Sequence, residues 1–193
     1  MDERWLRAAV AFGPERTLDQ DPTFAFRIVA DIALKALSPA INDPTTAVLS
    51  LDQLHRMLRI VGNRKLATDE LFGPKSGELR VICRTPNWED FVDLSFSEIR
   101  HYGADNLQVV RRLRALLDNL LQTLPEHRRP ALHQQLALLD REIEKQFAYP
   151  EEVELARVAD TQGLGGRARQ IGAIRPPPSE LAASATVCPR NET

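Results

Sequence analysis

The chain has 193 residues, of which 43% are hydrophobic and 27% charged. This composition suits one soluble domain with a sizeable core and excludes a wholly disordered chain. The formal net charge of -2 at pH 7 argues against general nucleic-acid affinity, so no nucleic-acid partner is expected. The longest apolar run, Ala8 to Phe12, is far too short to span a bilayer. Cys83 and Cys188 cannot build a disulfide framework, so a reducing compartment, the cytoplasm, is expected.

Helical periodicity dominates the start of the chain. Asp2 to Phe12 is expected to form a short first helix. Thr23 to Leu37 is apolar on nearly all sides, which predicts a helix in the centre of the domain. Asp43 is a good N-cap and Pro44 suits the first helical position, so a second long helix is expected up to Val61.

Residues 63 to 86 have a different character. Leu79 to Arg84 partly alternates and is rich in β-branched residues, which predicts a strand. Ala67 to Phe72 is its expected partner, across a loop from Gly73 to Gly77. Because a lone hairpin is marginally stable in water, this one is expected to pack on helices.

Helical periodicity returns after Asn87. The expected helices are Trp88 to Gly103, Leu107 to Leu124, Leu132 to Phe147 and a short piece from Glu151 to Ala159. The predicted fold is therefore mostly α, a bundle of about five to six helices with a small β-hairpin insertion. Residues 1–162 are expected to form this helical domain, and residues 163–193, which include a glycine pair and three consecutive prolines, a disordered C-terminal tail.

The turn from Ser38 to Thr46 is the first candidate site. It places Ser38, Asn42 and Asp43 at the junction of two apolar helices, where unpaired N–H groups and the helix dipole suit an anionic ligand. The alternative, which we favour, is that Asp43 itself caps these N–H groups and Asn42 completes the turn.

A charged row on the central helix is the second candidate. Arg27, Asp31 and Lys35 are spaced four residues apart, so they line one narrow face. Asp31 would be a buried acid with a shifted pKa in a functional site. The simpler interpretation, which we favour, is a ladder of i,i+4 ion pairs at the exposed edge.

Two carboxylate-x-x-His spacings, Asp52 with His55 and Glu98 with His101, are candidate pairs of metal ligands. Di-metal bundles use this spacing because it places both ligands on one helix face, but they also need carboxylates from two further helices. Both pairs lie beside the apolar stripes and not within them. We therefore expect surface pairs, no metal site and no cofactor.

A basic set in the second half of the chain comprises Arg111, Arg112, Arg114, His127, Arg128 and Arg129. Such a set could meet anionic lipid, RNA or an acidic partner. It lacks the interleaved aromatic residues of single-strand binding, and its first two arginines fall on the polar side of their helix. A solvated face is the favoured interpretation.

Several segments together resemble one known family. They are Glu15 to Pro22, Phe24 to Phe26, Asp31 to Pro39, Ile41 to Ala47, and Phe96 with Ile99-Arg100 and Tyr102-Gly103. This pattern is similar to that of the bacterial predicted membrane protein family catalogued as domain of unknown function 2254, over roughly residues 2 to 160. The chain departs from the family at Ala40, where glycine is common, so a left-handed residue is not carried over to that position.

The resemblance implies a link to the membrane and no reaction. Members of the family typically begin with several transmembrane helices, so this chain resembles the carboxy-terminal region alone, and a membrane-embedded half or a membrane surface is the implied partner. A homo-oligomer is left open. The matching polar residues are expected to form one buried network that joins the first two long helices to the Trp88 to His101 helix. They are Arg16, Thr17, Asp21, Arg27, Asp31, Ser38, Asn42, Asp43, Arg100 and Tyr102.

No catalytic motif such as Gly-x-Ser-x-Gly, a phosphate-binding loop or His-Glu-x-x-His is present. The leading hypothesis is a soluble module at the cytoplasmic face of a bacterial membrane protein, acting in regulation, assembly or ligand sensing without catalysis. The alternative is a hydrolytic or metal-dependent enzyme with a polar site around Asp31, Asn42 and Asp43. The two hypotheses differ in what the network of matching polar residues does. In a module its groups should pair with one another and leave no cleft, whereas in an enzyme a concave pocket should expose at least two of them with a shifted pKa.

Overall fold

The computed structural model describes residues 17, 21–73 and 75–166, and the expected first helix and most of the expected tail lie outside them. Within the described residues, six α-helices, one short 3-10 helix and a two-stranded hairpin confirm the mostly α fold. The elements are α2 (Pro22–Ala36), α3 (Pro44–Gly62), β1 (Glu70–Phe72), β2 (Leu79–Ile82), α4 (Trp88–Gly103), α5 (Leu107–Thr123), η1 (Glu126–Arg128), α6 (Arg129–Gln146) and α7 (Pro150–Ala156).

Polar residues ahead of the first four described helices determine where these helices begin. Asp21 caps α2 and Asp43 caps α3, each accepting a hydrogen bond from an amide in the first turn. A proline follows each aspartate, at a position where its missing N–H costs nothing. Asn87 and Asp90 form a capping box at α4, and Asn106 caps α5.

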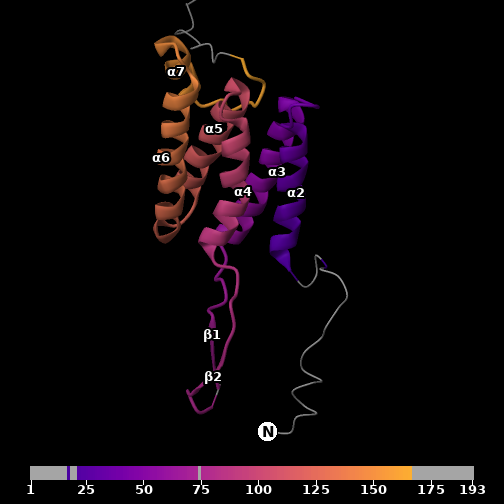
Figure 1. Ribbon diagram of the computed structural model, residues 1–193. Coiled ribbons are helices and arrows are strands. Elements are labelled where there is room, and N and C mark those ends of the chain that lie inside the picture. The colour runs from indigo at the N-terminus through magenta and orange to yellow at the C-terminus, as the bar shows by residue number, and fades with distance from the viewer. Residues whose placement is uncertain (1–16, 18–20, 74, 167–193) are drawn as a thin grey trace, which may run out of the picture.

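The long helices pack side by side and alternate in direction along the chain (Figure 1). α2 and α3 lie at one edge, α4 and α5 in the middle, and α6 at the other edge, where α7 packs against α5 and α6. α2, α4 and α6 therefore begin at the end from which the hairpin projects. Apolar side chains from all five long helices form the core, as their periodicity predicts. The largest fully buried ones are Phe26, Leu51, Leu54, Leu58, Trp88, Phe96, Ile99, Leu113, Leu117, Leu120 and Leu132.

The position of α2 corrects one expectation. This helix is at the edge of the described bundle and not in its centre, since it packs against α3 and α4 on one side only. Its buried face consists of Phe26 and three alanines, whose small side chains allow the neighbouring helices to approach closely. The larger Ile28 and Ile32 are 40% and 48% exposed. Apolar residues on all sides of a helix show that every side can be buried. They do not show how many other helices pack against it.

The hairpin is confirmed, but its expected packing is wrong. β1 and β2 pair antiparallel, with Leu71 opposite Val81 and Phe72 opposite Leu79, and one irregularity lies between these pairs. Every residue of both strands is exposed. Figure 1 shows the ribbon projecting beyond the end of the bundle, away from the helices. The sequence therefore predicts the strands, whereas the turn geometry that directs them away from the bundle is not visible in it.

Candidate functional site

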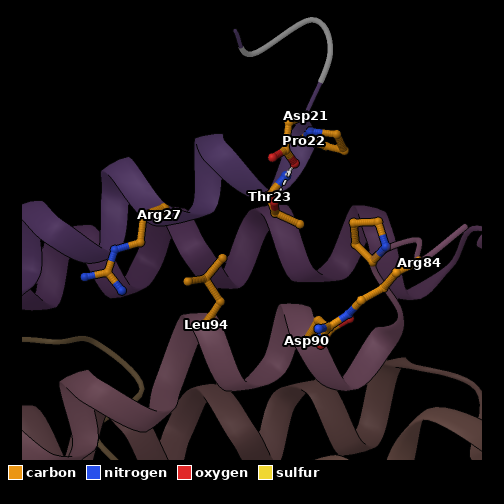
Figure 2. Close-up of a pocket in the computed structure, with 8 residues that line it drawn as sticks. Asp21, Pro22, Thr23, Arg27, Arg84, Asp90 and Leu94 are labelled. Atoms are coloured by element: carbon orange, nitrogen blue, oxygen red, sulfur yellow. Dashed lines mark hydrogen bonds and ion pairs between the residues drawn. The ribbon is translucent and has the colours of Figure 1, made fainter. Parts of the chain in front are cut away.

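Asp21 and Arg27, two of the residues in the family pattern, line a surface cavity at the hairpin end of the bundle (Figure 2). Its volume is about 650 Å³, and Figure 2 shows its side chains on facing turns of α2 and α4 and on the chain that follows β2. The lining residues of this α2–α4 cavity are Asp21, Pro22, Thr23, Arg27, Arg84, Pro86, Asp90 and Leu94. Two arginines and two aspartates balance in charge, so the cavity selects neither anions nor cations by net charge.

Arg27 connects α2 to α4 across this region. Its Nη1 donates to Glu98 Oε1 at 2.8 Å and its Nη2 to Glu98 Oε2 at 3.0 Å, and Nη2 also donates to Asp31. The hydrogen bonds from Arg27 lower the pKa of the Glu98 carboxyl, while Glu98 and Asp31 raise the pKa of the Arg27 guanidinium. The i,i+4 pair Arg27–Asp31 is thus present as expected. Asp31 is 56% exposed, so it is not the buried acid of the alternative hypothesis.

The α2–α3 corner, residues 37–43, lies at the opposite end of the bundle. The Asp43 amide donates to the Ala36 carbonyl at 2.8 Å, and the Asn42 amide donates to the Ser38 carbonyl at 2.9 Å. The Asp43 carboxylate accepts from the Thr46 amide at 3.1 Å and from its hydroxyl at 2.5 Å, and these bonds lower the pKa of Asp43. The capping interpretation is confirmed, because the groups that would hold an anion are occupied by Asp43.

Arg100 and Tyr102, near the end of α4, do not face α2. The Arg100 Nε donates to Gln135 Oε1 at 3.4 Å, and its Nη1 lies 3.9 Å from Glu142 Oε1, so it points towards α6. Burial lowers the pKa of Arg100, and Glu142 partly offsets this by favouring the charged form. Tyr102 is exposed and contacts the ring of His101 edge-on.

The described members of the family pattern therefore do not form one buried network, contrary to expectation. They divide among the α2–α4 cavity, the Arg27–Glu98 bridge, the α2–α3 corner and the α4–α6 interface. The Thr17 carbonyl accepts a hydrogen bond from the Asp21 amide at 3.1 Å, and Arg16 lies outside the described residues. A pattern in one chain shows which positions match a family, but not whether helix faces bring their side chains together.

The two carboxylate-x-x-His pairs have other partners. Asp52 Oδ1 accepts from the Arg112 Nε at 2.7 Å, and His55 Nε2 hydrogen-bonds with Asn119 Oδ1 at 2.9 Å. Burial lowers the pKa of His55, which keeps the imidazole neutral. Glu98 binds Arg27, as described above. Across residues 17, 21–73 and 75–166, no three His, Cys, Asp or Glu side chains are grouped so as to hold a metal ion.

The solvated face that the sequence predicts for Arg111 and Arg112 on α5 is wrong. Arg111 is only 2% exposed, and its guanidinium donates to the carbonyls of Val158, Gly165 and Gly166, each at 3.0 Å. Arg112 donates to Asp52 and to the carbonyls of residues 160 and 161. Both arginines therefore hold residues 157–166, which we call the C-terminal strap, against α5.

Asp160 organises the strap from within. Its buried carboxylate accepts from the amides of Gln162 at 3.1 Å, Gly163 at 2.9 Å and Gly165 at 2.6 Å. Gly163 and Gly165 have φ angles of 75° and 73°, which favour glycine. An aspartate ahead of Gly-x-Gly-Gly is the sequence signal for this turn. Residues 163–166, which the sequence predicts to be part of the disordered tail, are thus held on the bundle. Disorder of residues 167–193 stays a prediction, because they lie outside the described residues.

The other three arginines of the basic set also bind within the bundle, whereas His127 is exposed. Arg114 pairs with Asp140, while Arg129 pairs with Glu126 at 3.3 Å. The Arg128 guanidinium lies 5.4 Å from the centre of the Trp88 ring and donates to the Arg64 carbonyl at 3.0 Å. These arginines fasten one element to another, so they do not form an open basic patch.

Fold and side-chain pairing together define a helical domain in which the described polar groups hold helix ends and interfaces. The profile of the predicted membrane protein family DUF2254 matches residues 1–119, and the chain belongs to this family. Two uncharacterized proteins of Mycobacterium tuberculosis strains and one of Mycobacterium bovis are each 35% identical to it over 182 residues. The match covers 92% of this chain and 34% of each relative, so the chain spans about a third of their length.

No solved structure is significantly similar to the chain. Through the part of the chain that the structure describes, none of the helices has both the length and the apolar character needed to cross a membrane.

Proposed function

We propose that this chain is a non-catalytic assembly module of a bacterial membrane protein. The observation that supports this most directly is the separation of the three groups of the enzyme hypothesis. Asp31 pairs with Arg27 on an exposed helix face, Asp43 caps α3, and Asn42 is exposed in the corner between α2 and α3. Catalysis needs such groups to converge on one substrate, whereas a module needs them to stabilise its surface.

The α2 outer face, formed by Ile28 and Ile32, supplies the docking surface in this proposal. The two side chains lie one helical turn apart and are 40% and 48% exposed, on a helix whose opposite side is packed against α3 and α4. Adjacent exposed apolar side chains of this size are typical of surfaces that meet a partner. The partner we propose is the remainder of the membrane protein, because the relatives are about three times as long as the matched region.

Ligand sensing is a second candidate, which the α2–α4 cavity favours. Its volume of about 650 Å³ lies in the range of small-molecule pockets, and Leu94 gives it an apolar wall. Leu94→Trp would fill the cavity, so it should abolish any thermal stabilisation by a small molecule while leaving assembly through α2 intact. We also propose that the module lies at the cytoplasmic face, where an exposed thiol such as that of Cys83 would stay reduced.

Membrane fractionation tests the assembly proposal. The tagged chain is produced in its own bacterium, and the share in the membrane pellet is measured for wild type and for Ile28→Ser/Ile32→Ser. We expect a smaller share of the double variant than of wild type in the membrane pellet. Leu49→Ser/Ile60→Ser is the matched control, because it removes two apolar side chains of α3 that are each 58% exposed. Equal pelleting of wild type and the α2 variant would contradict the proposal.

A further inference from the structure

The hairpin has the highest density of exposed apolar side chains in the described chain. Five of the seven residues in β1 and β2 are large and apolar, and each is between 46% and 70% exposed. They are Leu71, Phe72, Leu79, Val81 and Ile82. Because a two-stranded ribbon is marginally stable in water by itself, so much open apolar surface indicates an occupant.

These side chains lie on both faces of the ribbon. Val81 and Ile82 are successive residues in the regular part of β2, and successive residues of a strand point to opposite faces. The register places Leu71 opposite Val81, so these two side chains share one face and Ile82 lies on the other. A globular partner that covered one face would leave the other exposed. An occupant that surrounds a thin ribbon fits this arrangement better.

The charges around the ribbon favour an anionic occupant. Between residues 63 and 86 there are five basic residues and three acidic ones, a net charge of +2 in a chain whose total is -2. The basic residues are Arg64, Lys65, Lys75, Arg80 and Arg84, and the acidic ones are Asp69, Glu70 and Glu78. The Arg80 and Arg84 side chains are 60% and 87% exposed, although each has an acidic neighbour at 3.3 Å. Both can therefore reach a phosphate from the ribbon.

We propose that the hairpin is a lipid-contacting element that lies in the headgroup region of an anionic bilayer. Acyl chains conform to both apolar faces, and Arg80, Arg84 and Lys75 extend to the phosphates. At this depth, water and lipid headgroups can form hydrogen bonds with the backbone N–H and C=O groups of the open strand edges and of the polar turn. The hydrocarbon interior could not. This inference rests on the proposed membrane-linked function, but it concerns a different surface from the α2 outer face.

Binding to protein-free vesicles tests the inference. The whole chain is sedimented with vesicles of phosphatidylcholine containing about 30% phosphatidylglycerol, and with phosphatidylcholine alone. We expect binding to the anionic vesicles, and at least about tenfold weaker binding for Phe72→Ser/Ile82→Ser, because two apolar side chains leave the interface. Arg80→Gln/Arg84→Gln should weaken binding only to the anionic vesicles. Circular dichroism should show unchanged helix content, since the ribbon does not support the bundle.

Leu49→Ser/Ile60→Ser is again the matched control, and it should bind vesicles like wild type. Absence of vesicle binding by wild type, or equal binding by the hairpin variant, would overturn the inference. A third outcome is that wild type does not bind vesicles but is a dimer in light scattering, while Phe72→Ser/Ile82→Ser is a monomer. That result would overturn the lipid contact and show that the ribbon binds a second copy of the chain. If wild type pellets normally in cells but does not bind vesicles, the lipid contact alone is refuted. If adding Ile28→Ser/Ile32→Ser to the Phe72→Ser/Ile82→Ser variant does not lower its share in the membrane pellet, the assembly proposal alone is refuted, because the hairpin no longer holds either protein on lipid.

Discussion

Arg27 of α2 and Glu98 of α4 form a two-point ion pair, with Nη1 to Oε1 at 2.8 Å and Nη2 to Oε2 at 3.0 Å. The two residues are 71 positions apart, so this contact fixes the edge helix against the middle of the bundle. It also connects the two surfaces of interest, since Arg27 lines the α2–α4 cavity and lies next to Ile28 of the α2 outer face.

Glu98→Gln should reduce the free energy of unfolding at pH 7 by at most about 1 kcal/mol, because both side chains are partly exposed and water screens the pair. Arg27 lowers the pKa of Glu98 in the folded state, so this stabilisation is present above the ordinary pKa of 4.5. It is lost as the pH falls through the lowered value. Urea unfolding of both proteins, from pH 7 downward, should show their difference disappearing in acid. Glu154→Gln, an exposed substitution on α7, is the control, and a difference that persists in acid would contradict the ion-pair explanation.

His55 should make stability depend on pH just below neutrality. Burial lowers its pKa from 6.5 in the folded state, so the unfolded chain takes up a proton first as the pH falls. The stabilisation is therefore complete above pH 6.5 and decreases between 6.5 and the lowered folded-state value. Urea midpoints of His55→Gln should vary less across this window than those of wild type. His133→Gln, on the exposed side of α6, should vary as wild type does, and equal slopes for all three would refute the assignment.

Local patterns in the sequence predict much of this fold. The apolar periodicity locates the five long helices, and Asp43 before Pro44 marks the beginning of one of them. The pair Arg27–Asp31 is also predictable, because a spacing of four residues brings side chains together on any helix. These features depend only on residues within one or two helical turns.

What the sequence does not show depends on distant neighbours. Glu98 was assigned to a surface pair with His101, but its partner is on α2. Arg111 is on the polar side of α5 and is nevertheless buried, since a segment about 50 residues later covers it. Polar periodicity indicates which side of a helix can tolerate water. It does not show whether another segment with free carbonyl groups displaces that water.

Arg111→Met should release the C-terminal strap. The substitution leaves three carbonyl groups without their charged donor, at a cost of about 2 kcal/mol in the free energy of unfolding. Hydrogen exchange should accelerate in residues 158–166 and change little in α3 and α4. Arg111→Lys keeps the charge but lacks the planar fork, so it should also release part of the strap. Arg141→Met, at an exposed position of α6, is the control, and an unchanged strap in Arg111→Met would contradict the holding role.

The α2–α3 corner requires a left-handed backbone at Asn42, whose φ is 47°, and not at Ala40. Asparagine tolerates this conformation and glycine adopts it without steric cost, whereas a β-branched residue is strained there. Asn42→Gly should therefore unfold at nearly the wild-type temperature, while Asn42→Val should lose about 1 to 2 kcal/mol. Ala40→Val is the matched control in the same turn and should be nearly neutral, since Ala40 is exposed and has no positive φ. The opposite result, in which valine is tolerated at position 42 but destabilises the protein at position 40, would contradict this assignment. The left-handed residue of the turn would then be at position 40, where the family commonly has glycine.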